Sequence, residues 1–440
     1  MKTTKLKGGI HPPYKKELTR NGETIFLDAG EFVYIPLLQH AGAVCSPIVS
    51  VGDSVLVGQK IADSEAFVSS PIHSSVSGRV SQIKKHLHPN GSMVETVVIE
   101  NDFKYKTIPP VSHNFRKILP DRIREIIREA GIVGMGGAGF PAHIKLNPPK
   151  DKPIDYVIIN GAECEPYLSS DHRAMIEQPE DLVRGLEIIM KTVRSKKGII
   201  AIEDNKPDAV ESIKKHLGKK PIEIAILKTK YPQGSEKHII KSVLGRTVPS
   251  GKLPADVGVV VVNVDTAISV KNALSTGMPI IRRRVTVSGL GIKNPAVYSV
   301  RIGTPFNEVI TAAGGICEDA VKIIMGGPMT GTQVFDTSAP VVKTTSGILA
   351  LSSAETDFYK EGPCLRCGRC VSVCPMNLMP LNIAAAGRAG DEEKALLYSA
   401  NDCVECGCCS YSCPARRNLM ESIRLAKAKA LSIIKQKGGK

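Results

Sequence analysis

Two copies of one cysteine pattern constrain this chain more than any other feature. Each copy has the spacing Cys-x2-Cys-x2-Cys-x3-Cys-Pro, and the copies begin at Cys364 and Cys403. Thiolates at this spacing hold pairs of [4Fe–4S] clusters, in which three cysteines of one run bind a cluster and the fourth comes from the other run. Zinc is the alternative, but zinc takes four tetrahedral ligands, commonly as two Cys-x2-Cys pairs. The spacing therefore predicts two iron–sulfur clusters and a protein that carries electrons.

The exchange of the fourth cysteine assigns each ligand to a cluster. The first cluster is predicted on Cys364, Cys367, Cys370 and Cys413, and the second on Cys403, Cys406, Cys409 and Cys374. These eight of twelve cysteines indicate a reducing compartment rather than a disulfide framework. Ligation by Cys408 would break the spacing, so this residue is predicted to be free. Cys45, Cys164 and Cys317 are predicted to be small buried hydrophobic residues.

The length and hydropathy of the chain allow several domains and no membrane span. Of the 440 residues, 42% are hydrophobic, which is enough for more than one core. No stretch approaches the roughly 18 apolar residues of a transmembrane helix, and the longest, Val257–Val264, is typical of a buried strand. The basic N-terminus lacks the apolar segment of a secretory signal. We therefore expect a protein of the cytosol or of the cytosolic face of a membrane.

The net charge of +15 is concentrated near the C-terminus. Eight Lys or Arg residues and one Glu lie between Ala415 and Lys440. Apolar residues recur there at helical spacing, which predicts a basic amphipathic helix over 416–440: Leu419, Ile423, Ala430 and Ile434. No aromatic residues are interleaved with the charges and the chain has no Trp, so nucleic acid is not expected. An anionic membrane surface or an acidic partner is favoured, with a solvated helix face as the alternative.

Changes of pattern along the chain predict its domains. Residues 1–110 read as short strands between Gly and Pro turns, and they resemble the barrel-sandwich fold of biotinyl and lipoyl carrier domains. No lysine lies between Lys60 and Lys84, around the expected hairpin tip near Phe67, so we expect a docking domain without a swinging group. Residues 111–280 alternate helices and strands, which predicts a parallel sheet. The remaining expected parts are a β-rich module over 281–335, a linker over 336–360, a two-cluster domain over 361–415 with a helical spacer, and the tail helix.

Four segments of the α/β region carry signs of a ligand. A loop with five glycines in nine residues, Gly131–Gly139, allows the backbone to approach a phosphate; alone it could be a flexible turn. The strand over 154–159 ends in an amide and two carboxylates, where parallel sheets bind ligands: Asn160, Glu163 and Glu165. Two further segments follow, with Tyr231, Gly234 and Glu236 in one and Asn263 and Thr266 in the other.

The order of these segments resembles the NADH- and FMN-binding flavoprotein subunit of respiratory complex I. With the N-terminal barrel and the C-terminal cysteine runs, the chain as a whole resembles the RnfC/RsxC family, the C subunits of the ion-translocating Rnf electron transport complex. The resemblance implies a multidomain α/β fold. Its parts are a β barrel-sandwich hybrid, a Rossmann-like parallel α/β flavin domain, a small β-grasp module of the soluble-ligand-binding kind, and an α-helical two-[4Fe–4S] ferredoxin-like domain.

The resemblance also implies which residues hold FMN and NAD(H). The FMN phosphate and ribityl chain would be held by Gly134, Gly136, Gly137, Gly139 and Lys145. The flavin would be lined by Asn160, Glu163, Tyr231, Gly234, Glu236, Asn263 and Thr266. The nicotinamide nucleotide would be held by Glu165, at a ribose hydroxyl, and by the Phe140 ring. The chain departs from the complex I protein at Ala162 and Cys164, where that family has Asp and Gly, so the flavin potential and the nucleotide fit could differ.

The function implied by the resemblance is that of one subunit of a ferredoxin:NAD oxidoreductase, acting without a catalytic acid or base. FMN would exchange hydride with NAD(H), single electrons would pass through both clusters, and the complex would translocate Na⁺ or H⁺. Expected partners are the other Rnf membrane and iron–sulfur subunits, with ferredoxin acting indirectly, on the cytoplasmic side of the bacterial membrane. The alternatives are a flavin subunit of a soluble hydrogenase or formate dehydrogenase, and a flavin-free electron relay. Flavin content would separate the relay from the enzymes.

Overall fold

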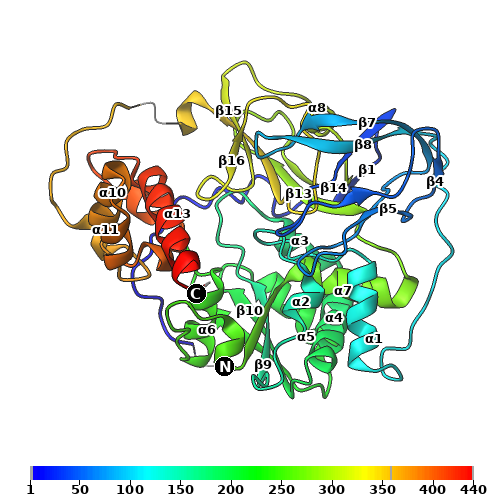
Figure 1. The fold of residues 1–440 in the computed structure, drawn as a ribbon, viewed down its shortest axis with the longest axis horizontal. Coiled ribbons are helices and arrows are strands. Elements are labelled where there is room, and N and C mark those ends of the chain that lie inside the picture. Colours follow the sequence, from blue (N-terminus) through cyan, green and yellow to red (C-terminus); the bar gives the residue numbers. More distant parts are fainter. Residues whose placement is uncertain (1–2, 357–358, 439–440) are drawn as a thin grey trace.

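The N-terminal domain consists of two small antiparallel sheets. They are seen in the computed structural model, which describes residues 3–356 and 359–438 (Figure 1). One sheet has the order β2-β8-β7-β4 and the other the order β3-β5-β6. Their bounds are β2 (Phe32–Pro36), β3 (Ser46–Pro47), β4 (Ser54–Val55), β5 (Lys60–Asp63), β6 (Ile72–His73), β7 (Gly78–Leu87) and β8 (Met93–Asn101). Alternate residues of β2, such as Val33 and Ile35, are buried between the sheets, as expected for strands with one face in a core.

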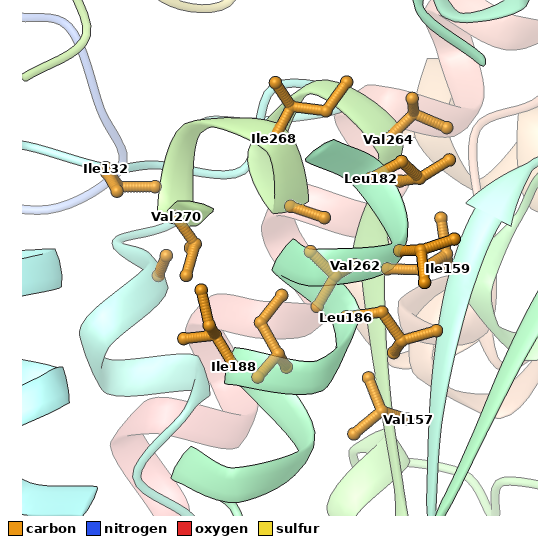
Figure 2. Packing of buried hydrophobic residues seen from close by; sticks show 14 of the residues in the cluster. Ile132, Val157, Ile159, Leu182, Leu186, Ile188, Val262, Val264, Ile268 and Val270 are labelled. Carbon is orange, nitrogen blue, oxygen red and sulfur yellow. The ribbon is translucent and has the colours of Figure 1, made fainter. Parts of the chain in front are cut away.

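The second domain is built on a parallel sheet with the order β11-β10-β9-β12. Its strands are β9 (Tyr156–Gly161), β10 (Lys197–Glu203), β11 (Ile222–Leu227) and β12 (Val259–Asn263). Its helices are α1 (Pro120–Glu129), α2 (Ala142–Lys145), α3 (Ser170–Glu177), α4 (Pro179–Thr192), α5 (Pro207–Leu217), α6 (Glu236–Leu244), α7 (Val264–Thr276) and the 3-10 turn η1 (Pro254–Val257). Figure 2 shows Val157, Ile159 and Val262 of the strands packing against Leu182 and Leu186 of α4. A second apolar cluster, which includes Ile158 and Val261, covers the other face, so these strands are almost continuously apolar.

The third domain is a six-stranded mixed sheet with the order β1-β14-β13-β17-β15-β16. Its elements are β1 (Ile25–Leu27), β13 (Arg282–Ser288), β14 (Ala296–Arg301), α8 (Phe306–Ala312), β15 (Ala320–Met325), β16 (Thr332–Val334), β17 (Gly347–Ser352) and the 3-10 turn η2 (Ser353–Glu355). The predicted linker over 336–360 is therefore wrong, because β17 lies inside the sheet and all six of its residues are buried. Residues 357–358 of that range lie outside the described residues.

The first part of the chain does not belong to the barrel that was predicted over 1–110. β1 pairs with β14 of the third domain. Residues 3–19, which we call the N-terminal strap, run along the second domain: Ile10 and Tyr231 exchange two backbone hydrogen bonds, and the Tyr167 amide donates to the Tyr14 carbonyl. The Gly9 amide donates to the Val373 carbonyl at 2.8 Å. The strap therefore connects the α/β domain to the first cysteine run; residues 1–2 lie outside the described part.

The C-terminal domain is helical. Its elements are α9 (Arg369–Ser372), α10 (Pro380–Ala389), α11 (Glu392–Leu397), η3 (Ala400–Asp402), α12 (Cys408–Tyr411) and α13 (Leu419–Gly438). A Cβ at Gly387 of α10 would lie 2.0 Å from the Ser422 carbonyl of α13, so glycine allows these helices to approach closely.

The predicted tail helix is thus part of the cluster domain. Leu419, Ile423, Ala426 and Ala430 of α13 are buried in a core shared with α10. Ile434, predicted on the same apolar face, is 42% exposed. The apolar face is therefore used inside this chain rather than left for a membrane; residues 439–440 of the predicted tail are not described. No helix within 3–356 and 359–438 is long and apolar enough to cross a membrane.

Candidate functional site

A cavity of about 660 Å³ lies at the carboxyl ends of β9 and β12. The glycine loop, the segment from Tyr231 to Glu236 and the turn between β15 and β16 close it on other sides. All fourteen residues predicted to hold flavin or nucleotide line this one cavity: Gly134, Gly136, Gly137, Gly139, Phe140, Lys145, Asn160, Glu163, Glu165, Tyr231, Gly234, Glu236, Asn263 and Thr266. Their roles toward a ligand stay predictions, but the fold brings them together at the sheet edge where ligands bind.

Thr266 and Arg283 fix the glycine loop. The Met135 amide donates to Thr266 Oγ1 at 3.0 Å, and this hydroxyl donates to the Val133 carbonyl. The buried Arg283 guanidinium, from the third domain, donates to the Met135 carbonyl at 3.2 Å. A Cβ at Gly137 would meet nothing within 4 Å, so the backbone there is open to the cavity. This arrangement fits the phosphate end of FMN, which backbone amides and glycines without side chains can approach.

Two asparagines fix the polar ends of the strands. Asn160 Nδ2 donates to the Gly234 carbonyl at 2.7 Å, which ties β9 to the loop after β11. Asn263 accepts from the amides of Asp265 and Thr266 and is the N-cap of α7. Its Nδ2 donates to Asp171 Oδ2 at 2.7 Å. Both amide side chains are therefore held in place by the protein.

Glu163 and Asp171 form a partly buried acidic pair in the cavity wall. Glu163 has a φ of 43°, and its carboxylate accepts from the Asp171 and His172 amides at the start of α3, at 2.7 and 3.2 Å. Burial, with the nearby Glu163 and Asp265 carboxylates, raises the pKa of Asp171 to about 8. Glu163 thus supports the start of α3, and Asp171 lies in the cavity wall with its pKa raised. Asp171 was not predicted, because no spacing in the sequence marks it.

Glu165 is held by the turn between β15 and β16. Its carboxylate accepts from the Met329 amide at 3.1 Å and from the Thr330 hydroxyl. Burial raises the pKa of Glu165, although these hydrogen bonds oppose the shift. The turn, Gly326–Gly331, also lines the cavity and was not predicted. Its glycine-rich sequence, Gly-Gly-Pro-Met-Thr-Gly, is the signal that could have identified it.

Lys145 and Phe140 lie on the more open side of the cavity. Lys145 of α2 pairs with Glu236, the first residue of α6, so an anionic ligand would compete with Glu236 for the ammonium group. Phe140 is 40% exposed and leaves a ring face available for stacking. The predicted phosphate contact of Lys145 and nicotinamide contact of Phe140 stay predictions.

Tyr231 joins the cavity to the second cysteine run. Its ring is buried beside Ile10, Cys164 and Cys408, and its hydroxyl donates to the Cys406 carbonyl at 2.8 Å. Cys406 itself lines the cavity, as does Val404. The Gly234 amide donates to the Cys164 sulfur at 3.3 Å, so this buried thiol supports the same loop. A predicted cluster ligand therefore lies in the wall of the predicted flavin cavity.

The four cysteines predicted for the second cluster lie together. Cys374, from the first run, lines one small apolar cavity with Cys403, Cys406 and Cys409 of the second. The exchange of the fourth cysteine is thus compatible with the fold. Cys408 is fully buried, lines the same small cavity and also packs beside Tyr231, so its predicted free state stays a prediction.

The four cysteines predicted for the first cluster are more open. Cys364 and Cys367 are exposed, and Cys370 and Cys413 are half-buried. Burial raises the pKa of Cys370, and the nearby Cys413 thiol adds to this shift, so the two runs meet here as well. Among the described residues, no group of three or more His, Cys, Asp or Glu side chains is placed to hold a metal ion. Cys374 with Cys403, Cys406 and Cys409 forms a donor set that suits an iron–sulfur cluster, whereas of the first set the structure places only Cys370 and Cys413 near each other.

The comparisons with known proteins agree with this arrangement. The C subunit of the Na⁺-translocating ferredoxin:NAD⁺ oxidoreductase complex of Acetobacterium woodii is 46% identical over 97% of this chain and 97% of its own length. The C subunit of the proton-translocating ferredoxin:NAD⁺ oxidoreductase complex of Clostridium ljungdahlii is 46% identical, over 96% and 93%. The C subunit of the ion-translocating oxidoreductase complex of Rhodobacter capsulatus is 43% identical, over 96% and 83%. This chain belongs to the RnfC family.

Family models match four successive parts of this RnfC-family chain. The RnfC barrel sandwich hybrid domain matches residues 4–104 and the Nuo51 FMN-binding domain matches 127–272. The SLBB domain matches 284–333, and the 4Fe-4S dicluster domain matches 363–416. The predicted fold class, the FMN-binding domain and the two-cluster domain are thereby confirmed, and zinc and the flavin-free relay are disfavoured. The crystal structure of an NAD⁺-reducing [NiFe]-hydrogenase in the air-oxidised state matches 72% of this chain and 64% of its own, with a TM-score of 0.52 and 20% identity, a likeness of fold alone.

Proposed function

We propose that this RnfC-family chain exchanges hydride between NAD(H) and FMN and passes single electrons through two [4Fe–4S] clusters, as part of a membrane-bound ferredoxin:NAD oxidoreductase. The observation that carries the proposal is the shared wall: Cys406 lines the same cavity as all fourteen predicted flavin and nucleotide residues. FMN bound there supplies the step between two-electron hydride chemistry and one-electron transfer. The names of the relatives support the assignment to an ion-translocating complex.

The residues of the cavity would orient the two substrates of hydride exchange. The glycine loop and Lys145 hold the FMN phosphate, while Asn160 and Asn263 fix the sheet edge against which the flavin lies. Glu165 would accept a hydrogen bond from a ribose hydroxyl of the nicotinamide nucleotide, and the Phe140 ring would stack on the nicotinamide ring. Since Glu165 already accepts from Met329 and Thr330, nucleotide entry would displace or share the hydrogen bonds of the β15–β16 turn.

The fold supports an order for the two clusters. The second-run cysteines lie next to Tyr231 and the cavity, whereas Cys364 and Cys367 are exposed on the other run. The second cluster is therefore the one next to the flavin, and the first cluster is the one that meets the remaining subunits. Those partners lie on the cytoplasmic side of the bacterial membrane, ferredoxin acts through them, and the complex couples electron flow to Na⁺ or H⁺ translocation.

Anaerobic stopped-flow mixing of the iron-loaded, FMN-containing protein with NADH tests the proposal. We expect bleaching of the flavin absorbance followed by bleaching of the cluster absorbance. A Glu165→Gln variant should need more NADH for the same rate, while its FMN content stays unchanged. Bound flavin that NADH does not reduce would refute the nucleotide assignment, and purified protein that binds clusters but no FMN would refute the proposal as a whole.

A further inference from the structure

The two cysteine runs differ most in what surrounds their first cysteines. Every residue from Pro363 to Arg369 is exposed. Leu365 in particular is 63% exposed. Figure 1 shows the orange chain between residue 359 and α10 as an arc on the outer side of the cluster domain, away from the sheet of the second domain. The corresponding residues of the second run, Cys403–Cys409, are half-buried or buried against that domain.

The exposed arc is attached to the end of the second run. The Gly362 amide donates to the Ala415 carbonyl at 3.0 Å, and Arg417 Nη1 donates to the Gly362 carbonyl at 3.1 Å. The Glu361 carboxylate accepts from the Asn418 amide at 2.6 Å. These contacts bring the arc next to Cys413, the fourth predicted ligand of the first cluster. Two of the four predicted ligands of this cluster, Cys364 and Cys367, are therefore exposed at the molecular surface.

The exposed side chains of this segment are basic, with apolar side chains among them in the sequence. Lys360, Arg366 and Arg369 are exposed, and neither arginine has a carboxylate partner among the described residues. Glu361 is the one acidic residue in the sequence from 359 to 379. Its carboxylate already accepts a hydrogen bond from the Asn418 amide. Leu365 and Met379 are 63% and 46% exposed. An acidic surface that also carries apolar side chains would be complementary to this segment.

We propose that this face, defined by Lys360, Leu365, Arg366, Arg369 and Met379, docks an acidic iron–sulfur protein that exchanges electrons with the first cluster. In each encounter one electron leaves the reduced cluster of the partner and reduces the cluster on Cys364, Cys367, Cys370 and Cys413; the reverse flow returns it. A lipid surface would also attract the arginines, but it neither carries electrons nor explains why thiol ligands reach this surface. The onward route to FMN rests on the proposed function, whereas the docking does not.

The test uses full-length, cluster-loaded protein without NADH and a reduced, acidic two-[4Fe–4S] ferredoxin as the probe. Stopped-flow bleaching of the clusters of this chain gives a second-order rate constant, measured from low to high salt. The variant Arg366→Glu/Arg369→Glu should lower this constant about tenfold or more at low salt, because charge complementarity steers encounter. The matched control is Lys214→Glu/Lys215→Glu, which reverses two exposed charges on α5 of the second domain and should leave the constant unchanged.

Iron content distinguishes loss of docking from loss of a cluster. Each variant should retain about eight iron atoms per chain. If the double variant loses iron, the single variants Arg366→Gln and Arg369→Gln replace it, and each should lower the constant and its salt dependence. Equal rate constants for the fully loaded outer-face and α5 variants would overturn the proposal. Reduction of the flavin by NADH is measured in a separate experiment. If the proposed function fails there, the effect of the variants on electron transfer from the ferredoxin can still be interpreted.

Discussion

The inner and outer sides of the cluster domain carry the same cysteine spacing in opposite surroundings. On the inner side, Cys406 lies in the cavity wall and its carbonyl accepts from the buried Tyr231 hydroxyl. On the outer side, Cys364 and Cys367 are exposed and belong to an arc held at Gly362. The spacing selects the metal chemistry, and the packing of each run decides its place in the electron route. Changes on the inner side should therefore affect folding and flavin-to-cluster transfer, and changes on the outer side should affect partners.

The largest expected effect comes from the cysteines that the runs exchange. Cys374→Ser should remove the cluster of the other run and leave about four iron atoms per chain. NADH should then bleach the flavin without bleaching the remaining cluster. Cys413→Ser should also halve the iron content but leave a cluster that NADH reduces. Iron analysis with stopped-flow absorbance checks both, and the opposite pairing of results would mean that each run binds its own cluster.

Two glycines of the loop separate folding from flavin binding. Gly139 has a φ of 71°, and a Cβ there would lie 2.8 Å from Thr344 Cγ2, so Gly139→Ala should lower the free energy of unfolding by about 1–2 kcal/mol. Gly137→Ala meets no protein atom within 4 Å and should leave thermal stability unchanged while weakening FMN binding. Thermal melts of the flavin-free protein and FMN titrations measure the two effects. Unchanged FMN affinity of Gly137→Ala would place the phosphate elsewhere.

A pH-dependent effect is expected on the inner side from Asp171. Its pKa is raised to about 8 from an ordinary value of about 3.9. Because the folded state keeps the proton that the unfolded state releases, the stabilisation is complete below about pH 4 and is lost as pH rises toward 8. Asp171→Asn should flatten this part of the stability curve. Urea unfolding of flavin-free protein at pH 5 and pH 8 checks the sign, and an equal pH dependence in the variant would contradict it.

The smallest expected effect is at the contact between the cavity and Cys406. Tyr231→Phe removes the hydroxyl that donates to the Cys406 carbonyl but keeps the ring among its buried neighbours. The loss of one buried hydrogen bond should cost about 1 kcal/mol. FMN content should be unchanged, and cluster bleaching after flavin bleaching should slow slightly. A large loss of flavin would instead show that the hydroxyl belongs to the FMN site.

Local patterns were sufficient for the elements of the second domain. The apolar runs of β9 and β12 and the residues at their ends predicted both the parallel sheet and the edge where the cavity lies. β17 was missed, although Ile348–Leu351 is a continuous apolar run of the kind that buried strands have. The glycine-rich turn at 326–331 carried a similar unused signal. In both cases the pattern was present but its partner strands were distant in sequence.

Other features depend on contacts that no local pattern records. Lys16 of the N-terminal strap donates to the Glu163 carbonyl at 2.8 Å, 147 residues away. Asp171 has its unusual pKa because it is buried with Glu163 and Asp265 packed beside it. The different exposure of the two cysteine runs also depends on long-range packing, because the spacing of the cysteines is identical in both runs. Contacts between residues so far apart in the sequence could be identified only from the structure.

The order of the clusters is the central claim, and rapid mixing of NADH with Cys364→Ser and Cys406→Ser proteins tests it most directly. Each variant should retain FMN and one cluster. In Cys364→Ser the flavin and then the second cluster should bleach at the rate of the unmodified protein. In Cys406→Ser the flavin should bleach while the first cluster stays oxidised on the same timescale. Rapid cluster reduction in Cys406→Ser with none in Cys364→Ser would contradict the account.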